Sequence, residues 1–304
     1  TQGRPGGYQY SQDFLDRLLR QDRPDLSSEI ISVFPLLPHG NTWPGRFSLY
    51  IDATLRQNFE DYGLGRRLSR AVKARALAAE REQYERAERV VCMIQYAANS
   101  VVSQYGIQGA KVHVVHVGAN LDEDLLRGAE AFDAPDRREL VLGFVGKDWR
   151  RKGLPLLLDV AEKISSRGQP VRVIAVGPPP HELPTSRYLD ARGFVSKSTE
   201  MPRFISTLRS VHFGCLLSQA EAAGVSTIEF LRLGVPVVGF DVGGLAERIG
   251  PWNGVRLAAG AKAERIADEI LEAWNAHHYE ELRRRTWAER ELHSWDRAVA
   301  ELMR

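Results

Sequence analysis

Two glutamates with seven residues between them, Glu221 and Glu229, stand on either side of a glycine-bearing turn and a predicted helix start. At the start of such a helix the backbone amides of Gly224, Val225 and Ser226 would point outward, where they favour an anion such as a phosphate. Carboxylate oxygens accept hydrogen bonds from hydroxyl groups. Phosphates and hydroxyls together describe a nucleotide sugar. The alternative is a plain strand-to-helix crossover with a surface Glu221, and the spacing alone does not separate the two.

A cluster of four cations supplies the second chemical signal. Lys147, Arg150, Arg151 and Lys152 follow an apolar run and precede Gly153. Cations at the carboxyl end of a strand suit a diphosphate. The alternative is a solvated charge run, and the glycine and predicted helix beyond it favour the diphosphate.

The elements that would position these residues alternate between short apolar runs and amphipathic segments. The predicted strands are Leu140–Gly146, Val171–Gly177, Gly193–Val195, Phe213–Leu217 and Pro236–Phe240. The predicted helices are Gly153–Ser166, Thr199–Ser210 and Val225–Leu233. This alternation predicts a doubly wound parallel sheet, in which ligands bind beyond the carboxyl ends of the strands. Both clusters fall at that edge.

The first part of the chain also reads as α/β, but it is thin for a complete domain. The predicted strands are Ile30–Phe34, Ser48–Ile51, Arg89–Ile94 and Val112–Val117, and Leu64–Arg89 is a predicted helix. We expect this domain to be reduced or truncated. With a boundary inside Gly118–Pro135, the expected domains are 1–122 and 123–304, the latter helical after Ala261.

Composition limits the functional classes. The chain has 304 residues, a net charge of +2 and 26% charged residues, which argues against a dedicated nucleic-acid binder. Cys92 and Cys215 lie in apolar runs and read as buried residues, which favours a reducing, cytoplasmic location. We find no apolar run long enough to span a membrane. Because the eight histidines are scattered, we expect no metal.

Four segments resemble a family 4 glycosyltransferase of the GT-B fold. FVGKDWRRKGLPLLLDVAEKI resembles that family's strand, phosphate-binding basic loop and helix, and LLSQAEAAGVSTIEFLRLGVPVVGFDVGG resembles its signature segment. VHVVHVGANLD resembles its inter-domain strand, and SWDRAVAELM its C-terminal helix. The resemblance implies two Rossmann-like domains facing across a cleft, with helix 294–304 crossing back to the first. It also implies a metal-independent, retaining enzyme with a UDP- or GDP-linked sugar donor.

The resemblance assigns roles to individual residues. Lys152 matches the lysine on the donor diphosphate, and Lys147 stands where the family usually has an arginine for the same task. Glu221 matches the glutamate on the transferred sugar, and Glu229 matches the one on the ribose. The remaining donor-binding candidates are the turn amides and the strand ends beside the base: Gly224, Val225, Ser226, Phe194, Val195 and Gly146.

The first half departs from the family, since no glycine-rich loop follows its first strand. SLYIDATLRQNFEDYGL resembles a subset of these transferases that reads Asp-Ala-Thr where others have an active-site histidine. Asp52 at that place would position an acceptor or donor hydroxyl. The alternative is that Asp52 caps the following helix.

The predicted helix from Leu64 is basic at its start, with Arg66, Arg67, Arg70, Lys73 and Arg75 before any acidic residue. In this fold such a helix can contact an anionic membrane surface through residues 64–76, beside a lipid-linked acceptor. The favoured alternative is a solvated face with later pairs such as Glu82–Arg86 and Glu85–Arg89.

The sequence therefore predicts transfer of a hexose from a nucleotide-diphosphate sugar to an acceptor hydroxyl on a glycan, a lipid-linked acceptor or a small molecule. Two other functions stay open. One is a non-catalytic, glycosyltransferase-like partner subunit, which the thin first domain motivates. The other is a nucleotide-sugar epimerase on the same fold, for which no convincing acid–base set is visible.

Overall fold

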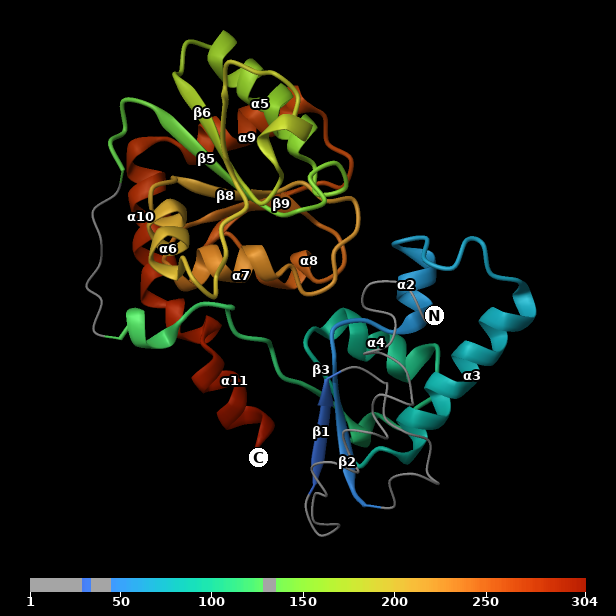
Figure 1. Cartoon of the computed structure of the whole chain (residues 1–304). Helices are drawn as coiled ribbons and strands as arrows, with labels where there is room; N and C mark the ends of the chain where they lie inside the picture. Colours follow the sequence, from blue (N-terminus) through green and yellow to red (C-terminus); the bar gives the residue numbers. More distant parts are fainter. Residues whose placement is uncertain (1–28, 34–44, 128–134) are drawn as a thin grey trace. The chain divides into compact units, whose positions relative to one another are not determined.

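The computed structural model describes residues 29–33, 45–127 and 135–304. The chain divides into two compact units, the first ending at His116 and the second running from Val117 to Arg304 (Figure 1). The expected domain boundary, after residue 122, lies a few residues further along the chain.

The described residues of the first unit form a parallel sheet of four strands in the order β1-β2-β3-β4. The strands are β1 (Ile30–Val33), β2 (Phe47–Ile51), β3 (Val90–Cys92) and β4 (Val112–Val114). The helices are α2 (Leu55–Glu60), α3 (Arg70–Arg86) and α4 (Gln95–Ser103), with a 3-10 turn, η2, at Gly109–Lys111. The four predicted strands of this part are confirmed within a few residues at each end.

A buried carboxyl ties the helices of the first unit together. Glu80 on α3 accepts hydrogen bonds from the Leu55 amide at 2.8 and 3.0 Å, from the Tyr84 hydroxyl at 2.8 Å and from the Tyr105 hydroxyl. Glu80 therefore holds the first amide of α2 and the residue that follows α4. Burial raises the pKa of this carboxyl.

The second unit contains a parallel sheet of six strands in the order β10-β9-β8-β5-β6-β7. The strands are β5 (Leu140–Val145), β6 (Val171–Val176), β7 (Leu189–Gly193), β8 (Phe213–Leu216), β9 (Val237–Phe240) and β10 (Gly254–Leu257). From β5 the chain adds strands outward on one side and then, from β8, on the other. The strand order thus reverses between β5 and β8, and in such sheets ligands bind beyond the carboxyl ends at that place.

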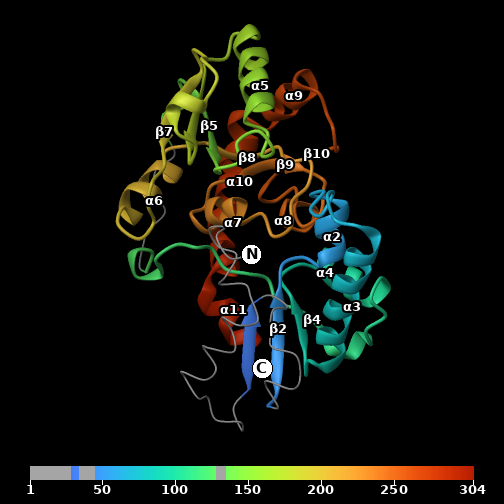
Figure 2. The same cartoon turned by 45° about the vertical axis from the view of Figure 1, so that its right-hand side comes forward.

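Helices cover both faces of this sheet. Figures 1 and 2 show α5 and α9 over one face and α7 and α8 over the other. The core between the first pair and the strands includes Leu142, Phe144, Phe213 and Phe240. The helices are α5 (Leu154–Ser166), α6 (Met201–Arg209), α7 (Val225–Arg232), α8 (Leu245–Arg248), α9 (Ala263–Ala273), α10 (Ala276–Ala288) and α11 (Trp295–Leu302). The 3-10 turns are η3 (Glu123–Leu125), η4 (Pro180–Glu182) and η5 (Arg290–His293).

The two edge strands of this sheet differ from the prediction. The strand predicted at Gly193–Val195 is wrong in place, since β7 covers Leu189–Gly193, and β10 was not predicted. Edge strands carry fewer apolar residues because one side meets solvent. β7 reads LDARG, with Asp190 paired to Arg172 of β6 at 3.2 Å, so it lacks the apolar run that marks a central strand.

The helix predicted from Leu64 begins later than expected. The Ser69 side chain accepts a hydrogen bond from the Val72 amide and caps α3, which starts at Arg70. Residues 64–69 are therefore a turn outside the helix. The expected pairs within α3 are replaced by Arg81 with Glu85 at 2.8 Å.

The start of α11 lies against the residues that open the second unit. The Ala119 amide donates to the His293 carbonyl at 2.8 Å, and the Trp295 indole donates to the Asn120 side chain at 3.3 Å. Whether helix 294–304 also contacts the first unit stays a prediction.

Candidate active site

Most candidate residues of the second unit lie in the loops that follow β5 and β8, where the strand order reverses, or in the first turns of α7. The other two candidates, Phe194 and Val195, follow β7. Gly153, which ends the first of these loops and begins α5, has a φ of 83°. A Cβ at this position would collide with the Leu217 carbonyl at the start of the second loop. Glycine is required here by conformation and by space, and the two loops pack directly against each other.

The cations of the loop after β5 each contact a different residue. The Lys147 ammonium lies 4.6 Å from the ring centroid of Phe194, and the Arg150 guanidinium lies 3.9 Å from that of Trp149. The Lys152 side chain crosses over Gly146, where a Cβ would collide with it. Lys147 and Arg150 are exposed and Arg151 and Lys152 are half-buried, so the alternative of a solvated charge run stays open for this cluster.

Glu221 is oriented by the same loop. Its Oε2 accepts a hydrogen bond from the Ser218 hydroxyl at 3.0 Å and from the Arg151 guanidinium at 3.4 Å. Arg151 also donates to the Ala220 carbonyl at 3.1 Å and bonds Asp148 at 3.2 Å. The carboxylate of Glu221 is therefore ion-paired, and Arg151, which the sequence placed only in the basic cluster, is the residue that orients it.

The start of α7 presents backbone amides without a side-chain cap. Gly224 precedes the helix with a φ of 59°, a conformation that glycine adopts without strain, and it offers no side chain to the first amides. Its Cα packs closely on Leu245, since a Cβ would lie 2.7 Å from that side chain. The amides of Val225 and Ser226 follow, as predicted for an anion-binding helix start.

Glu229 lies one turn further along α7 and is only 1% exposed. The Lys197 ammonium, from the loop after β7, donates a hydrogen bond to its Oε1. Burial raises the pKa of Glu229, and the charges of Lys197 and Lys152 oppose that rise. The structure thus brings Lys152 and Glu229 into one electrostatic environment.

Lys197 was missed by the sequence prediction. A signal was present, since Glu229 stands among apolar residues of a buried helix, and a buried carboxylate is almost always paired. The sequence did not say which cation would pair with it, because Lys197 is separated from Glu229 by a helix and a strand.

The two candidates for the base site differ in exposure. Phe194 directly follows β7 and is 58% exposed, whereas Val195 is buried. Phe194 already stacks against the Lys147 ammonium. An exposed aromatic face at the carboxyl edge is suited to contact a planar base.

Asp52 belongs to the first unit and follows β2 directly. The residue that caps α2 is Thr54, whose side chain accepts from the Gln57 amide in a capping box. The alternative in which Asp52 caps the helix is therefore wrong. Its role in positioning a hydroxyl stays a prediction.

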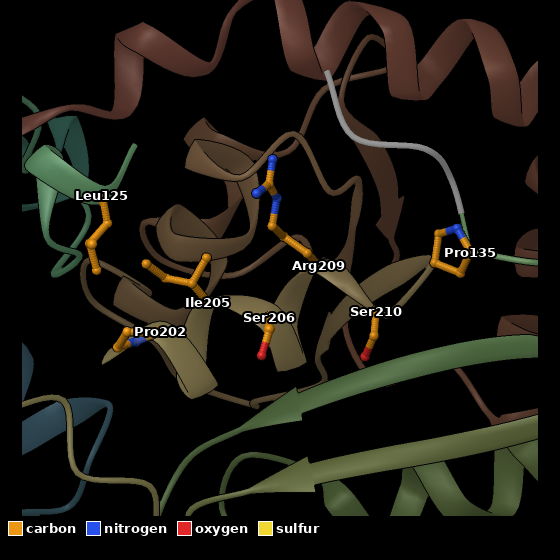
Figure 3. A pocket seen from close by; sticks show the side chains of 7 residues that line it. All are labelled: Leu125, Pro135, Pro202, Ile205, Ser206, Arg209 and Ser210. Carbon is orange, nitrogen blue, oxygen red and sulfur yellow. The ribbon is translucent and has the colours of Figure 1, made fainter. Parts of the chain in front are cut away.

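A hollow of about 530 Å³ elsewhere on the second unit is a different feature (Figure 3). Figure 3 shows Ser206 and Arg209 of α6 on its wall, with Pro135 opposite. None of the lining residues belongs to the loops after β5 and β8: Leu125, Pro135, Pro202, Ile205, Ser206, Arg209 and Ser210.

The described part of the chain shows neither a metal-binding cluster nor a membrane-spanning helix. Within it, no group of three or more His, Cys, Asp or Glu side chains is placed to hold a metal ion. No helix in the same ranges combines the length and the apolar character needed to cross a membrane. The predicted independence from metal stays a prediction. Cys92 and Cys215 are buried free thiols, as expected.

Comparison with known proteins identifies the second unit. Residues 139–276 match the family model described as glycosyl transferases group 1. This part of the chain is similar to the group 1 glycosyltransferases, and the match covers a little under half of the chain. The D-inositol 3-phosphate glycosyltransferase of Gordonia bronchialis is 26% identical over 223 residues, which is 62% of this chain and 48% of the relative. That of Kribbella flavida is 31% identical over 213 residues, covering 64% and 50%. The chain spans about half the length of these curated relatives.

Solved structures show the fold of the whole chain. The Alr3699/HepE protein of Anabaena, in complex with UDP, has a TM-score of 0.70 at 14% identity over 96% of this chain and 82% of that one. A glycosyltransferase from Rickettsia africae has a TM-score of 0.65 at 13% identity, covering 100% and 81%. The predicted α/β class of the GT-B type is confirmed. The narrower family 4 assignment and the retaining mechanism stay predictions.

Proposed function

We propose that the protein is a family 4 glycosyltransferase that moves a hexose from a UDP- or GDP-linked sugar to an acceptor hydroxyl with retention of configuration. The observation that carries this proposal is the convergence at the reversal of strand order. There, the loop after β5 carries Lys152 and the loop after β8 carries Glu221. The uncapped start of α7 follows, and Glu229 lies on that helix, paired with Lys197.

The developing charge on the leaving diphosphate is stabilised from two sides. Lys152 and Lys147 supply cations from the loop after β5. The amides of Gly224, Val225 and Ser226 supply the positive end of α7. Preorganised donors of this kind lower the barrier because they need no rearrangement when charge develops.

The remaining donor contacts use residues whose chemistry matches each part of a nucleotide sugar. Glu221, oriented by Arg151, accepts hydrogen bonds from hydroxyls of the transferred sugar. Glu229 accepts from the ribose. Phe194 and Val195 border the base, and Gly146 allows close approach of the donor.

Two observations guide the proposed acceptor: the names of the curated relatives and the position of Asp52. The curated relatives in Gordonia and Kribbella are named for D-inositol 3-phosphate, so a phosphorylated polyol is the first acceptor to test. Asp52 would position a hydroxyl. A glycan or lipid-linked acceptor is the other class proposed.

Peripheral contact with the cytoplasmic face of a membrane is part of the same proposal. Leu64, Leu68 and Val72 are exposed apolar side chains, and they alternate with the exposed Arg67 and Arg70. Apolar and basic side chains together suit an anionic lipid surface. Co-sedimentation with phosphatidylglycerol vesicles, but not phosphatidylcholine vesicles, is expected, and equal binding to both or to neither contradicts it.

A donor panel tests the function. The full chain is mixed with UDP-, GDP- and ADP-sugars and inositol phosphate, in the presence of EDTA, and free nucleotide and product are measured. We expect nucleotide release coupled to transfer, with EDTA present because no metal is proposed. An altered sugar without nucleotide release would indicate an epimerase. Absence of binding to every donor would indicate a non-catalytic subunit and contradict the proposal.

A further inference from the structure

Lys197 lies in the loop between β7 and α6 and contacts a residue of α7. The loop that carries it is tightly built: the Glu200 amide donates to the Ser196 carbonyl at 2.7 Å, and the Ser196 amide donates to the Glu200 carboxylate at 3.3 Å. Its ammonium lies 4.5 Å from the ring centroid of Phe204, which is buried on α6. The side chain is therefore held between Phe204 and Glu229.

We infer that Lys197 is a positioning residue for the donor: it keeps Glu229 ionised and fixes one carboxylate oxygen so that the carboxylate accepts hydrogen bonds from the ribose diol. The inference depends on the proposed function, since it names how that site reads the ribose. It assigns a role to a residue outside the motif segments that suggested the activity.

The two carboxylate oxygens of Glu229 can serve different partners, one the Lys197 ammonium and the other the ribose hydroxyls. An ionised carboxylate has about four acceptor positions on two oxygens. Lys197 occupies Oε1 of Glu229, and the capacity that remains suits two adjacent hydroxyls. A neutral Glu229 would present an O–H donor and lose part of that capacity.

The electrostatics require a cation beside this carboxyl. Glu229 is almost fully buried, and burial favours its neutral form. The charged groups that face it are Lys197 from the loop after β7 and Lys152 from the loop after β5. In the proposed donor complex Lys152 is engaged by the diphosphate, which leaves Lys197 as the cation dedicated to Glu229.

The test is a double-mutant-type cycle in which both the ligand and the protein are changed. Titration calorimetry on the full chain measures the binding affinity of each combination. The probes are UDP and GDP, each compared with its 2′,3′-dideoxy form, against the unmodified protein and the Lys197→Met variant. The methionine keeps an apolar stem over Phe204. Lys163→Met is the matched control, since Lys163 forms a surface ion pair with Glu264 at 3.0 Å.

We expect removal of the ribose hydroxyls to weaken binding of the preferred diphosphate by about tenfold to a hundredfold in the unmodified protein. That loss should shrink to a few-fold in Lys197→Met and stay full in Lys163→Met. The Lys197→Met variant should also lose affinity as the pH falls, because its Glu229 pKa rises further. Lys197→Arg should restore the hydroxyl dependence.

The outcomes separate the inference from the function. If the unmodified protein binds neither UDP nor GDP, the proposed function fails. If it binds one of them and Lys197→Met keeps the full hydroxyl dependence, the function stands and the inference is overturned. Should Lys197→Met not fold, Lys197→Gln, which keeps a hydrogen-bond donor without charge, is read by the same criteria. A folded protein is confirmed by its circular dichroism.

Discussion

Among the described residues, each unit buries one glutamate, and the two carboxyl groups have opposite kinds of hydrogen-bond partner. Glu80 in the first unit is 5% exposed and Glu229 in the second is 1% exposed, and burial raises the pKa of both. Glu80 is surrounded by neutral donors, namely two tyrosine hydroxyls and a backbone amide. Glu229 is held by a lysine from a loop at the edge where ligands bind.

The partners of a buried carboxyl group distinguish a structural role, as for Glu80, from the binding role that we propose for Glu229. Neutral donors on three elements fix those elements together, and such a network tolerates protonation of Glu80. In the proposed site, Lys197 keeps Glu229 ionised and leaves its other carboxylate oxygen to a ligand. Burial alone does not separate the two roles, but the charge and origin of the partner do.

The largest expected effect is on catalysis in the second unit. Lys152→Ala should lower kcat by about a hundredfold to a thousandfold, because it removes a cation aimed at the leaving diphosphate. Steady-state turnover with the preferred donor measures it, with Lys163→Ala as the control. Unchanged turnover in Lys152→Ala contradicts the assignment of this residue to the phosphate.

The next largest effects come from replacing each of the two buried glutamates with glutamine in separate variants. Glu229→Gln should weaken nucleotide diphosphate binding by about tenfold or more, because the amide accepts at one atom where the carboxylate accepted at two. Glu80→Gln should leave binding unchanged and lower the free energy of unfolding by about 1–3 kcal/mol. Calorimetry and urea unfolding give the two quantities. Loss of binding in Glu80→Gln alone would reverse the comparison.

The pH dependence of stability should also differ between the units. His212 accepts a hydrogen bond from the Val141 amide at 2.9 Å, and burial lowers its pKa from 6.5 to about 4. Unfolded chains bind that proton more readily, so the stability of the second unit should fall as the pH drops from 6.5 toward 4. The raised pKa of Glu80 acts oppositely: its contribution is present at low pH and is lost as the pH rises through its folded value.

Urea unfolding followed at several pH values measures this contrast. In His212→Gln the fall of second-unit stability between pH 6.5 and 4 should be smaller than in the unmodified protein. An equal pH slope in both proteins would mean that His212 is not the group responsible.

The smallest effect is expected from a surface ion pair. Lys163 and Glu264 are joined at 3.0 Å with largely exposed side chains, and solvent screens such a pair. Lys163→Ala should leave Tm and turnover unchanged. A clear fall in Tm would show that pairing as such, and not burial, governs the contribution of the carboxylates.

The sequence predicted the parts of the site that neighbours along the chain determine. The apolar runs of β5 and β8 and the glycines before α5 and α7 are local signals, and they placed Lys152 and Glu221 at strand ends correctly. The pairings Arg151–Glu221 and Lys197–Glu229 were not predicted. They depend on which strands are adjacent, and strand order is decided by the packing of the whole sheet.

The prediction of the two edge strands, β7 and β10, failed for a related reason. β7 and β10 have half-solvated, partly charged sequences, so a search for apolar runs passes over them. The predicted strand Gly193–Val195 and helix Thr199–Ser210 still left Lys197 in a loop, but nothing in the sequence indicated that its partner would be Glu229.

We propose above that Lys152, in the loop after β5, and Glu229, on α7, bind a nucleotide diphosphate. Calorimetric titration of the full chain with UDP and GDP tests it most directly, alongside the Lys152→Ala/Glu229→Gln double variant. We expect saturable binding of one nucleotide per chain for UDP, GDP or both, and no binding in the double variant. Absence of binding to both nucleotides, or binding that the double variant retains, would contradict it.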